Sequence, residues 1–179
     1  MENSIELSKK ERLSYILQLK ILQKLSEPSE SSHYENQITA LESGFALHYQ
    51  DILEILSEEE LSPDDCQDIL DILEMYRGII YSYEGLKRKG TEITINENDV
   101  KFPGFDGNHE SKQMAYVKYF IDDLDRYSEI QKLSNGYYNS HSGMLRKYKA
   151  MLIKWDEYKS LPNRYLMNEE QIKELLSRY

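Results

Sequence analysis

Four side chains are the candidates for a functional cleft: Glu74, Arg77, Asp106 and Arg126. Glu74 lies among apolar residues at helical spacing, so we expect it close to buried surface. A carboxylate placed there needs a positively charged partner. We expect Arg77 to be too near in register to face Glu74, so the predicted partner comes from another helix, either Arg126 or Arg146. The pattern favours an interhelical ion pair, and a functional carboxylate in a cleft is the alternative.

The stretch Asp106-Gly107-Asn108-His109-Glu110 invites a metal or phosphate interpretation. It does not match the calcium-binding loop, which needs acids at alternating positions and a glutamate at its twelfth position. Asp106 is well placed to cap a helix that begins at about Asn108. Capping is therefore the predicted role of Asp106.

A row of four acids, Asp122, Asp123, Asp125 and Glu129, lies on one predicted helix. Such carboxylates could help to hold a divalent cation. Metal sites in helical bundles more often take Glu-x-x-His pairs from facing helices. A solvated helix face, with an ion pair between Asp122 and Arg126, is the preferred interpretation.

Motifs that mark familiar catalytic or cofactor sites are absent from the sequence. There is no glycine-rich dinucleotide loop, no Walker lysine motif and no Gly-x-Ser-x-Gly. The one cysteine, Cys66, stands among Asp64, Asp65 and Asp68, whose negative charge opposes a reactive thiolate. The sequence therefore predicts no catalytic residue, no bound metal and no cofactor.

Charge is distributed unevenly along a chain whose net charge is −10. Residues 25–76 hold fourteen acids and no lysine or arginine, which leaves 18 of the 32 acids beside all 22 bases elsewhere. An acidic segment repels phosphate backbones and suits a basic partner surface, although it can also serve only for solubility. The predicted partner-binding residues are Glu58, Glu59, Glu60, Asp64 and Asp68.

A basic stretch over residues 146–159 gives a nucleic-acid alternative. It combines bases with Tyr148 and Trp155, a mixture that can bind phosphates and stack on bases. The two aromatic residues are seven apart and share a helix face, which is more typical of core packing. Nucleic acid is therefore an unlikely partner. The bases are Arg146, Lys147, Lys149, Lys154 and Lys159.

Helical periodicity runs through most of the chain. It predicts about six helices, near residues 8–25, 32–56, 62–89, 108–131, 142–158 and 168–175, and Gly44 is a point where the second could divide. Ser8 with Glu11, Ser32 with Glu35 and Asn168 with Gln171 form capping-box patterns, and Ser62-Pro63 is a helix start. One long irregular loop is expected near residues 90–107. The predicted fold class is an all-α, single-domain bundle over residues 1–179.

The cellular setting is predicted from what the sequence lacks. The N-terminus is polar, without the apolar core of a signal peptide, and no apolar run is long enough to cross a membrane. A lone cysteine excludes an internal disulfide framework. We therefore expect a cytoplasmic protein with no membrane contact.

Three segments together resemble a known family. They are residues 71–76, residues 102–106 with their Phe-Pro-Gly-Phe-Asp sequence, and residues 151–165 with Trp155, Pro162 and Tyr165. Their order and spacing are similar to the YfbU family of small bacterial proteins, and the resemblance runs from the first predicted helix to the last. It implies an all-helical cytoplasmic protein. It implies no catalytic residues, because the family has no agreed chemistry.

These observations favour a protein-interaction or regulatory module that uses an acidic surface to bind a basic or mixed-charge protein partner. We expect a homodimer or small homo-oligomer, in which the acidic half of one copy could meet a basic segment of another. Two alternatives stay open. One is a hydrolase or metal-dependent nuclease with a carboxylate site that the sequence does not identify, and the other is nucleic-acid binding through the basic stretch.

Overall fold

The computed structural model describes residues 5–57, 59–90 and 92–177. Within these ranges the regular secondary structure is helical, and only an isolated bridge between Phe105 and Asn139 has β geometry. The predicted all-α class is therefore confirmed. The chain divides into two compact units, Met1–Glu60 and Leu61–Tyr179, and each has its own hydrophobic cluster. The sequence predicted one domain over residues 1–179. That the two units fold and function as a single domain stays a prediction.

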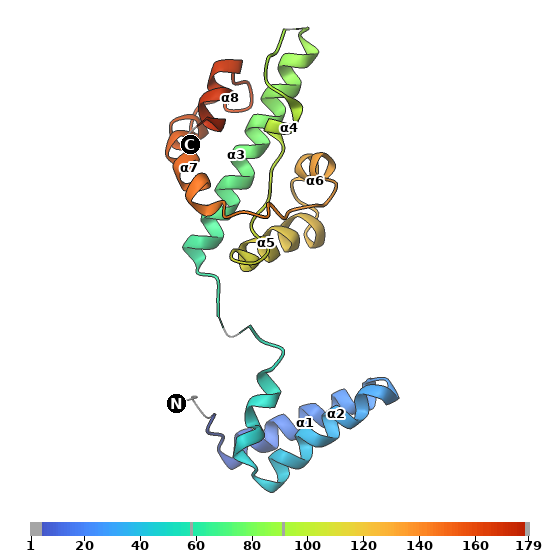
Figure 1. The fold of residues 1–179 in the computed structure, drawn as a ribbon. Coiled ribbons are helices and arrows are strands. Elements are labelled where there is room, and N and C mark those ends of the chain that lie inside the picture. The colour runs from blue at the N-terminus through green and yellow to red at the C-terminus, as the bar shows by residue number, and fades with distance from the viewer. Residues whose placement is uncertain (1–4, 58, 91, 178–179) are drawn as a thin grey trace. The chain divides into compact units, whose positions relative to one another are not determined.

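Unit 1 is a helical hairpin closed by a short 3-10 helix. Its elements are α1 (Lys9–Leu25), α2 (Pro28–Ser43) and η1 (Ala46–Leu53) (Figure 1). Ser8 and Glu11 form the predicted capping box. The second predicted box is wrong, because Pro28 starts α2 four residues before Ser32. Gly44 does end α2, in the left-handed conformation.

The core of unit 1 is small. Among its described residues, the cluster of buried apolar side chains consists of Ile16, Leu19, Ile38, Leu41 and Tyr49. Other apolar residues of the unit are exposed, among them a row on α1 that is described below. This unit thus buries only part of its apolar surface within itself.

Unit 2 is built around α3 (Pro63–Arg88). Ser62 caps this helix by accepting the Asp65 N–H, and Pro63 occupies its first turn, as predicted. Helices α7 and α8 flank α3 on one side, and α5 and α6 flank it on the other (Figure 1). Their bounds are α5 (Ser111–Lys118), α6 (Ser128–Ser134), α7 (Leu145–Lys159) and α8 (Glu169–Leu176).

The predicted helix over residues 108–131 is interrupted. It begins at Ser111 and continues through a π-helical turn, η2 (Tyr119–Asp123), after which the chain turns sharply. Asp125 and Tyr127 both have positive φ angles, 52° and 51°, and α6 begins only after them. Non-glycine residues seldom adopt this conformation, and no glycine or proline marks the break. The sequence therefore gives no sign that the helix ends here.

The irregular stretch near residues 90–107 is largely as predicted, with one addition. A single helical turn, α4 (Glu97–Val100), forms within it behind an Asn96 cap. The apolar residues around this turn are buried members of the unit 2 core: Ile95, Val100, Phe102 and Phe105. The loop is therefore part of the core and not a surface linker.

Aromatic packing fixes α7 against α3. Trp155 is buried beside Gly78, where a Cβ atom would lie 2.8 Å from the indole ring. Tyr148 stacks with Phe102 and meets Tyr76 edge-on. Tyr148 and Trp155 are thus core residues, as their seven-residue spacing predicted. Among the helices of the described residues, none is long and apolar enough to cross a membrane.

Candidate functional site

Glu74 and Arg77 lie one turn apart on α3 and form an ion pair. Arg77 Nη1 lies 3.4 Å from Glu74 Oε2, and each side chain is 27% exposed. The Nε atom of Arg77 donates a 2.6 Å hydrogen bond to Glu129 Oε1 of α6. Residues three apart on a helix are neighbours, which explains the contact between Arg77 and Glu74. Because Arg77 Nε bonds to Glu129, one guanidinium holds both carboxylates. We call Glu74, Arg77, Glu129, Tyr127 and Tyr165 the α3 polar network.

Two tyrosines complete the α3 polar network. The hydroxyl of Tyr127 donates to Glu74 Oε2 at 3.4 Å, and that of Tyr165 donates to Glu74 Oε1. The guanidinium of Arg77 lies 3.9 Å from the ring centroid of Tyr127, a cation–π contact. Both oxygens of Glu74 are therefore engaged, as expected for a carboxylate that is largely removed from water.

The predicted partner of Glu74 was wrong. Arg77 does face it, and the further cation near it is Arg164, whose Nε lies 3.8 Å from Glu74 Oε1. Arg126 lies exposed in the turn before α6 and has no part in the network among the described residues. Arg146 is exposed on α7. The prediction underestimated how readily side chains three apart on a helix meet.

Burial of the Tyr127 ring, and then the charge of Glu74, raise the pKa of Tyr127 to about 12. We therefore expect the absorbance titration of wild type minus that of Tyr127→Phe to have its midpoint near pH 12. The phenolate form is disfavoured in the folded chain, so this group's stabilising contribution is full below pH 10 and declines as the pH rises toward 12. A difference titration centred at pH 10 would contradict the described contacts.

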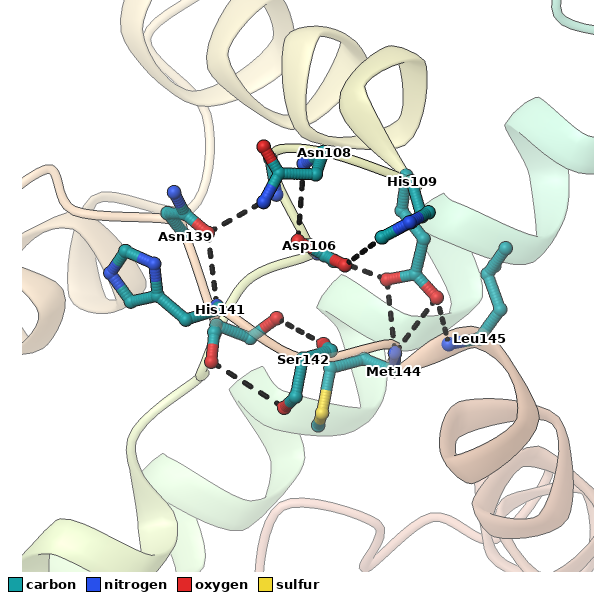
Figure 2. A network of polar contacts seen from close by, with 11 residues as sticks. Asp106, Asn108, His109, Asn139, His141, Ser142, Met144 and Leu145 are labelled. Atoms are coloured by element: carbon teal, nitrogen blue, oxygen red, sulfur yellow. Dashed lines mark hydrogen bonds and ion pairs between the residues drawn. The ribbon is translucent and has the colours of Figure 1, made fainter.

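Asp106 belongs to a different network, around the N-terminus of α7 (Figure 2). Its Oδ1 accepts the Asn108 N–H at 3.1 Å, and its Oδ2 lies 2.6 Å from His109 Nδ1. The hydrogen bond to His109 holds the pKa of Asp106 below its usual value. Because α5 begins at Ser111, Asp106 closes a turn and does not cap the helix as predicted.

Glu110 is the centre of this second network. It is 6% exposed, and its Oε1 accepts the N–H groups of Met144 and Leu145, each at 2.8 Å. Its Oε2 accepts the N–H of Asp106 at 3.0 Å. The carboxylate thus caps α7 from a segment more than thirty residues earlier and also holds the loop before α5. Its oxygens are fully used by the backbone, so the role we assign to Glu110 is structural.

The row of acids on the predicted 108–131 helix does not form a metal site. Among the described residues, no group of three His, Cys, Asp or Glu side chains is placed to hold a metal ion. Asp122 accepts hydrogen bonds from Tyr138 and Gln131, so its predicted pairing with Arg126 was wrong. The hydrolase or nuclease alternative stays a prediction, which an increase in melting temperature with Mg²⁺ or Mn²⁺ would support.

The predicted partner-binding acids are divided between the two units. Glu59 and Glu60 are exposed at the end of unit 1, and Glu58 lies outside the described residues. Asp64 is exposed in the first turn of α3, and Asp68 follows it half-buried. All four described acids are accessible to some degree, but they do not form one surface within either unit.

Acids neutralise much of the basic stretch on α7. Lys154 pairs with Glu157 and Glu174, and Lys159 pairs with Asp156 and Asp71. Ion-paired lysines have fewer counterions to release on phosphate binding, which weakens the nucleic-acid alternative. Lys147 lines a cleft of about 590 Å³ with Lys101 and Lys173, and this cleft also holds Asp99. Glu169 pairs with Lys173 at 2.9 Å, so the positive charge there is also partly compensated.

Among the described residues, the three most exposed large apolar side chains are Ile55, Leu47 and Leu25 of unit 1, at 89%, 85% and 79%. On α1, Leu13, Leu17 and Ile21 are 56%, 56% and 59% exposed, and their spacing of four residues places them on one side. Beside them, a groove of about 330 Å³ lies between α1 and α2. Contiguous exposed apolar surface is typical of an interaction site. We call Leu13, Leu17 and Ile21 the α1 apolar face.

A family model described as the YfbU domain matches residues 5–177 of the chain. The chain belongs to the YfbU family. It is also similar to the UPF0304 protein MJECS11 of Methanocaldococcus jannaschii, with 36% identity over 173 residues, which are 96% of this chain and 99% of that protein. The resemblance that the three segments indicated is confirmed. Neither the name of the family nor that of the relative states an activity, a ligand or a partner.

Sequence reasoning missed the contacts of several important residues of this YfbU family member. Glu129 and Tyr165 hold the α3 polar network, and Glu110 and Asn139 hold the network at α7. No sequence pattern pairs these residues with their partners, because the contacts join distant segments. The α1 apolar face did have a signal. Leu13, Leu17 and Ile21 recur every four residues, which predicts a shared helical face but not whether that face is buried.

Proposed function

We propose that this YfbU family member is a cytoplasmic protein-interaction module without an enzymatic site of its own. The observation that carries the proposal is the amount of apolar surface that unit 1 leaves exposed. The α1 apolar face is more than half exposed, and Ile55 and Leu56 are 89% and 61% exposed. Exposed surface of this kind on a small helical unit is expected to be covered by a partner.

Acidic residues surround the second of these apolar sites. Residues 54–60 have the sequence Glu-Ile-Leu-Ser-Glu-Glu-Glu, and we call them the acidic segment. Apolar side chains next to carboxylates suit a partner surface that is apolar at its centre and basic at its rim. Asp64 and Asp68 at the start of α3 are proposed as a further part of the partner contact.

A recovery experiment tests the acidic contact. The tagged chain is isolated from a lysate of its native host at low salt, with and without nuclease, beside Glu58→Gln/Glu59→Gln/Glu60→Gln. We expect a protein partner that survives nuclease and is recovered about tenfold less with the triple variant, equal to about 1.4 kcal/mol of binding free energy.

The matched control removes the same charge elsewhere, by Glu84→Gln, Glu92→Gln and Glu170→Gln, all at exposed positions of unit 2. It should recover as much partner as wild type. Equal recovery with all three proteins would contradict the acidic contact. A partner lost on nuclease treatment would favour the nucleic-acid alternative instead.

A further inference from the structure

The groove between α1 and α2 has an apolar floor and a basic rim. Its apolar lining residues are Leu13, Ile16, Leu17 and Leu41. The bases that line it are Lys9, Arg12 and Lys20, and Glu42 is the one acid. In a chain with a net charge of −10, this is an unusual concentration of positive charge around an apolar surface. An acidic segment with apolar side chains is the ligand chemistry that fits.

The present interactions of two rim bases, Lys20 and Arg12, show which of them can bind a ligand carboxylate. Lys20 pairs with Glu42 at 2.7 Å, but both side chains are 50% exposed, and an exposed pair of this kind contributes little to stability. Arg12 donates from Nη1 to the Leu41 carbonyl at 3.1 Å. Its Nε is buried and has no hydrogen-bond acceptor among the described residues. A carboxylate that enters the groove can therefore take the place of Glu42 beside Lys20, while Arg12 stays bound to the Leu41 carbonyl.

The chain itself contains a segment with the complementary chemistry. The acidic segment presents Ile55 and Leu56 to solvent, and Glu59 and Glu60 follow them, also exposed. None of its described residues lines the groove of its own unit. Apolar side chains could therefore cover Leu13 and Leu17 in another copy, with the glutamates beside Lys9 and Lys20.

We propose that two copies of this chain form a dimer in which the acidic segment of each occupies the α1–α2 groove of the other. Each copy offers one groove and one segment, so reciprocal exchange satisfies both and closes with two-fold symmetry. The dimer rests on the proposed function, because it uses the same exposed apolar and acidic residues. It identifies the partner of the basic groove as a second copy of the chain.

A charge exchange tests the dimer with the full-length chain. The groove variant is Lys9→Glu/Lys20→Glu, and the segment variant is Glu59→Lys/Glu60→Lys. In either variant the groove and the segment carry the same charge, so each protein alone should dissociate. Sedimentation at low salt should show the dissociation constant raised by about tenfold or more. When the two variants are mixed, opposite charges meet at both contacts, and a heterodimer should form with an affinity close to that of wild type.

Two further variants keep the test decisive. Lys118→Glu/Lys149→Glu changes two exposed lysines of unit 2 and should remain dimeric. Leu17→Asp tests the groove by its apolar floor and should be monomeric, which matters if the groove variant does not fold. Circular dichroism checks the fold of every protein. If the segment variant folds and stays dimeric, the proposal is overturned, whatever the groove variant shows.

Other results also separate this dimer from the proposed function. A wild-type chain that is monomeric up to about 100 µM overturns the dimer, whereas the loss of a host partner with the glutamine variant can still stand. A dimer that survives both charge reversals, or variants that do not recombine on mixing, overturns it as well. If the mixed variants form a heterodimer but no host partner depends on the acids, the dimer stands and the acidic contact with another protein does not.

Discussion

Gly104→Ala should lower the free energy of unfolding of unit 2 by more than about 4 kcal/mol, the range reserved for severe backbone conflicts. Gly104 has a φ angle of 88°, and a Cβ atom there would lie 1.9 Å from the Tyr138 carbonyl oxygen and 2.1 Å from its carbon. The obstacle is backbone, which cannot move aside as a side chain could. The Phe105 N–H donates to this same carbonyl at 2.9 Å, so the substitution also separates the 104–107 loop from residues 138–140.

Gly136→Ala provides the matched control for this substitution. Gly136 also has a positive φ angle, 70°, but no atom lies within 4 Å of an added Cβ. It should therefore cost only the backbone strain of a left-handed alanine, about 1–2 kcal/mol. Urea unfolding followed by the fluorescence of Trp155, the one tryptophan of the chain, reports on unit 2 directly. Equal losses for the two variants would mean that the close approach of Gly104 to Tyr138 does not exist in solution.

Local signals in the sequence predicted much of the helical architecture. Ser8, Ser62 and Asn168 act within four residues of themselves, and all three cap helices as predicted. Helical periodicity likewise identified the buried faces of α3 and α7. These features depend on spacing along one helix, which a single sequence displays.

Features that depend on contacts between distant segments were not predicted. The left-handed conformations of Asp125 and Tyr127 divide a stretch whose composition favours one continuous helix. Glu110 binds backbone N–H groups 34 and 35 residues away, and its neighbours in sequence give no sign of this. The exposure of the α1 apolar face was not predicted either, because periodicity identifies an apolar face but not what covers it.

The same limit explains why the candidate site was only half predicted. Glu74 was predicted to need a cationic partner, but that partner was wrongly sought on another helix: Arg77 pairs with it, and the remaining contacts come from α6 and from the segment before α8. A carboxylate with a full set of hydrogen bonds holds helices together. An exposed apolar face has no such function within its own unit, and for that reason the proposed interaction uses the α1 apolar face and the acidic segment and not the α3 polar network.

Glu110→Ala should lower the free energy of unfolding of unit 2 by about 3–5 kcal/mol. The substitution removes the acceptor of three N–H groups, and Asp106 and Met144 are buried, so water replaces the carboxylate poorly. It also removes a negative charge from the start of α7. Glu110→Gln keeps the shape and one acceptor oxygen, so its loss should be smaller. Glu84→Ala, at an exposed site on α3, should stay within about 0.5 kcal/mol of wild type. Urea unfolding measured by Trp155 fluorescence gives all three values. If Glu110→Ala behaved like Glu84→Ala, the N-terminus of α7 would need no cap from Glu110, and the loop before α5 would be held by Asp106 and Asn139 alone.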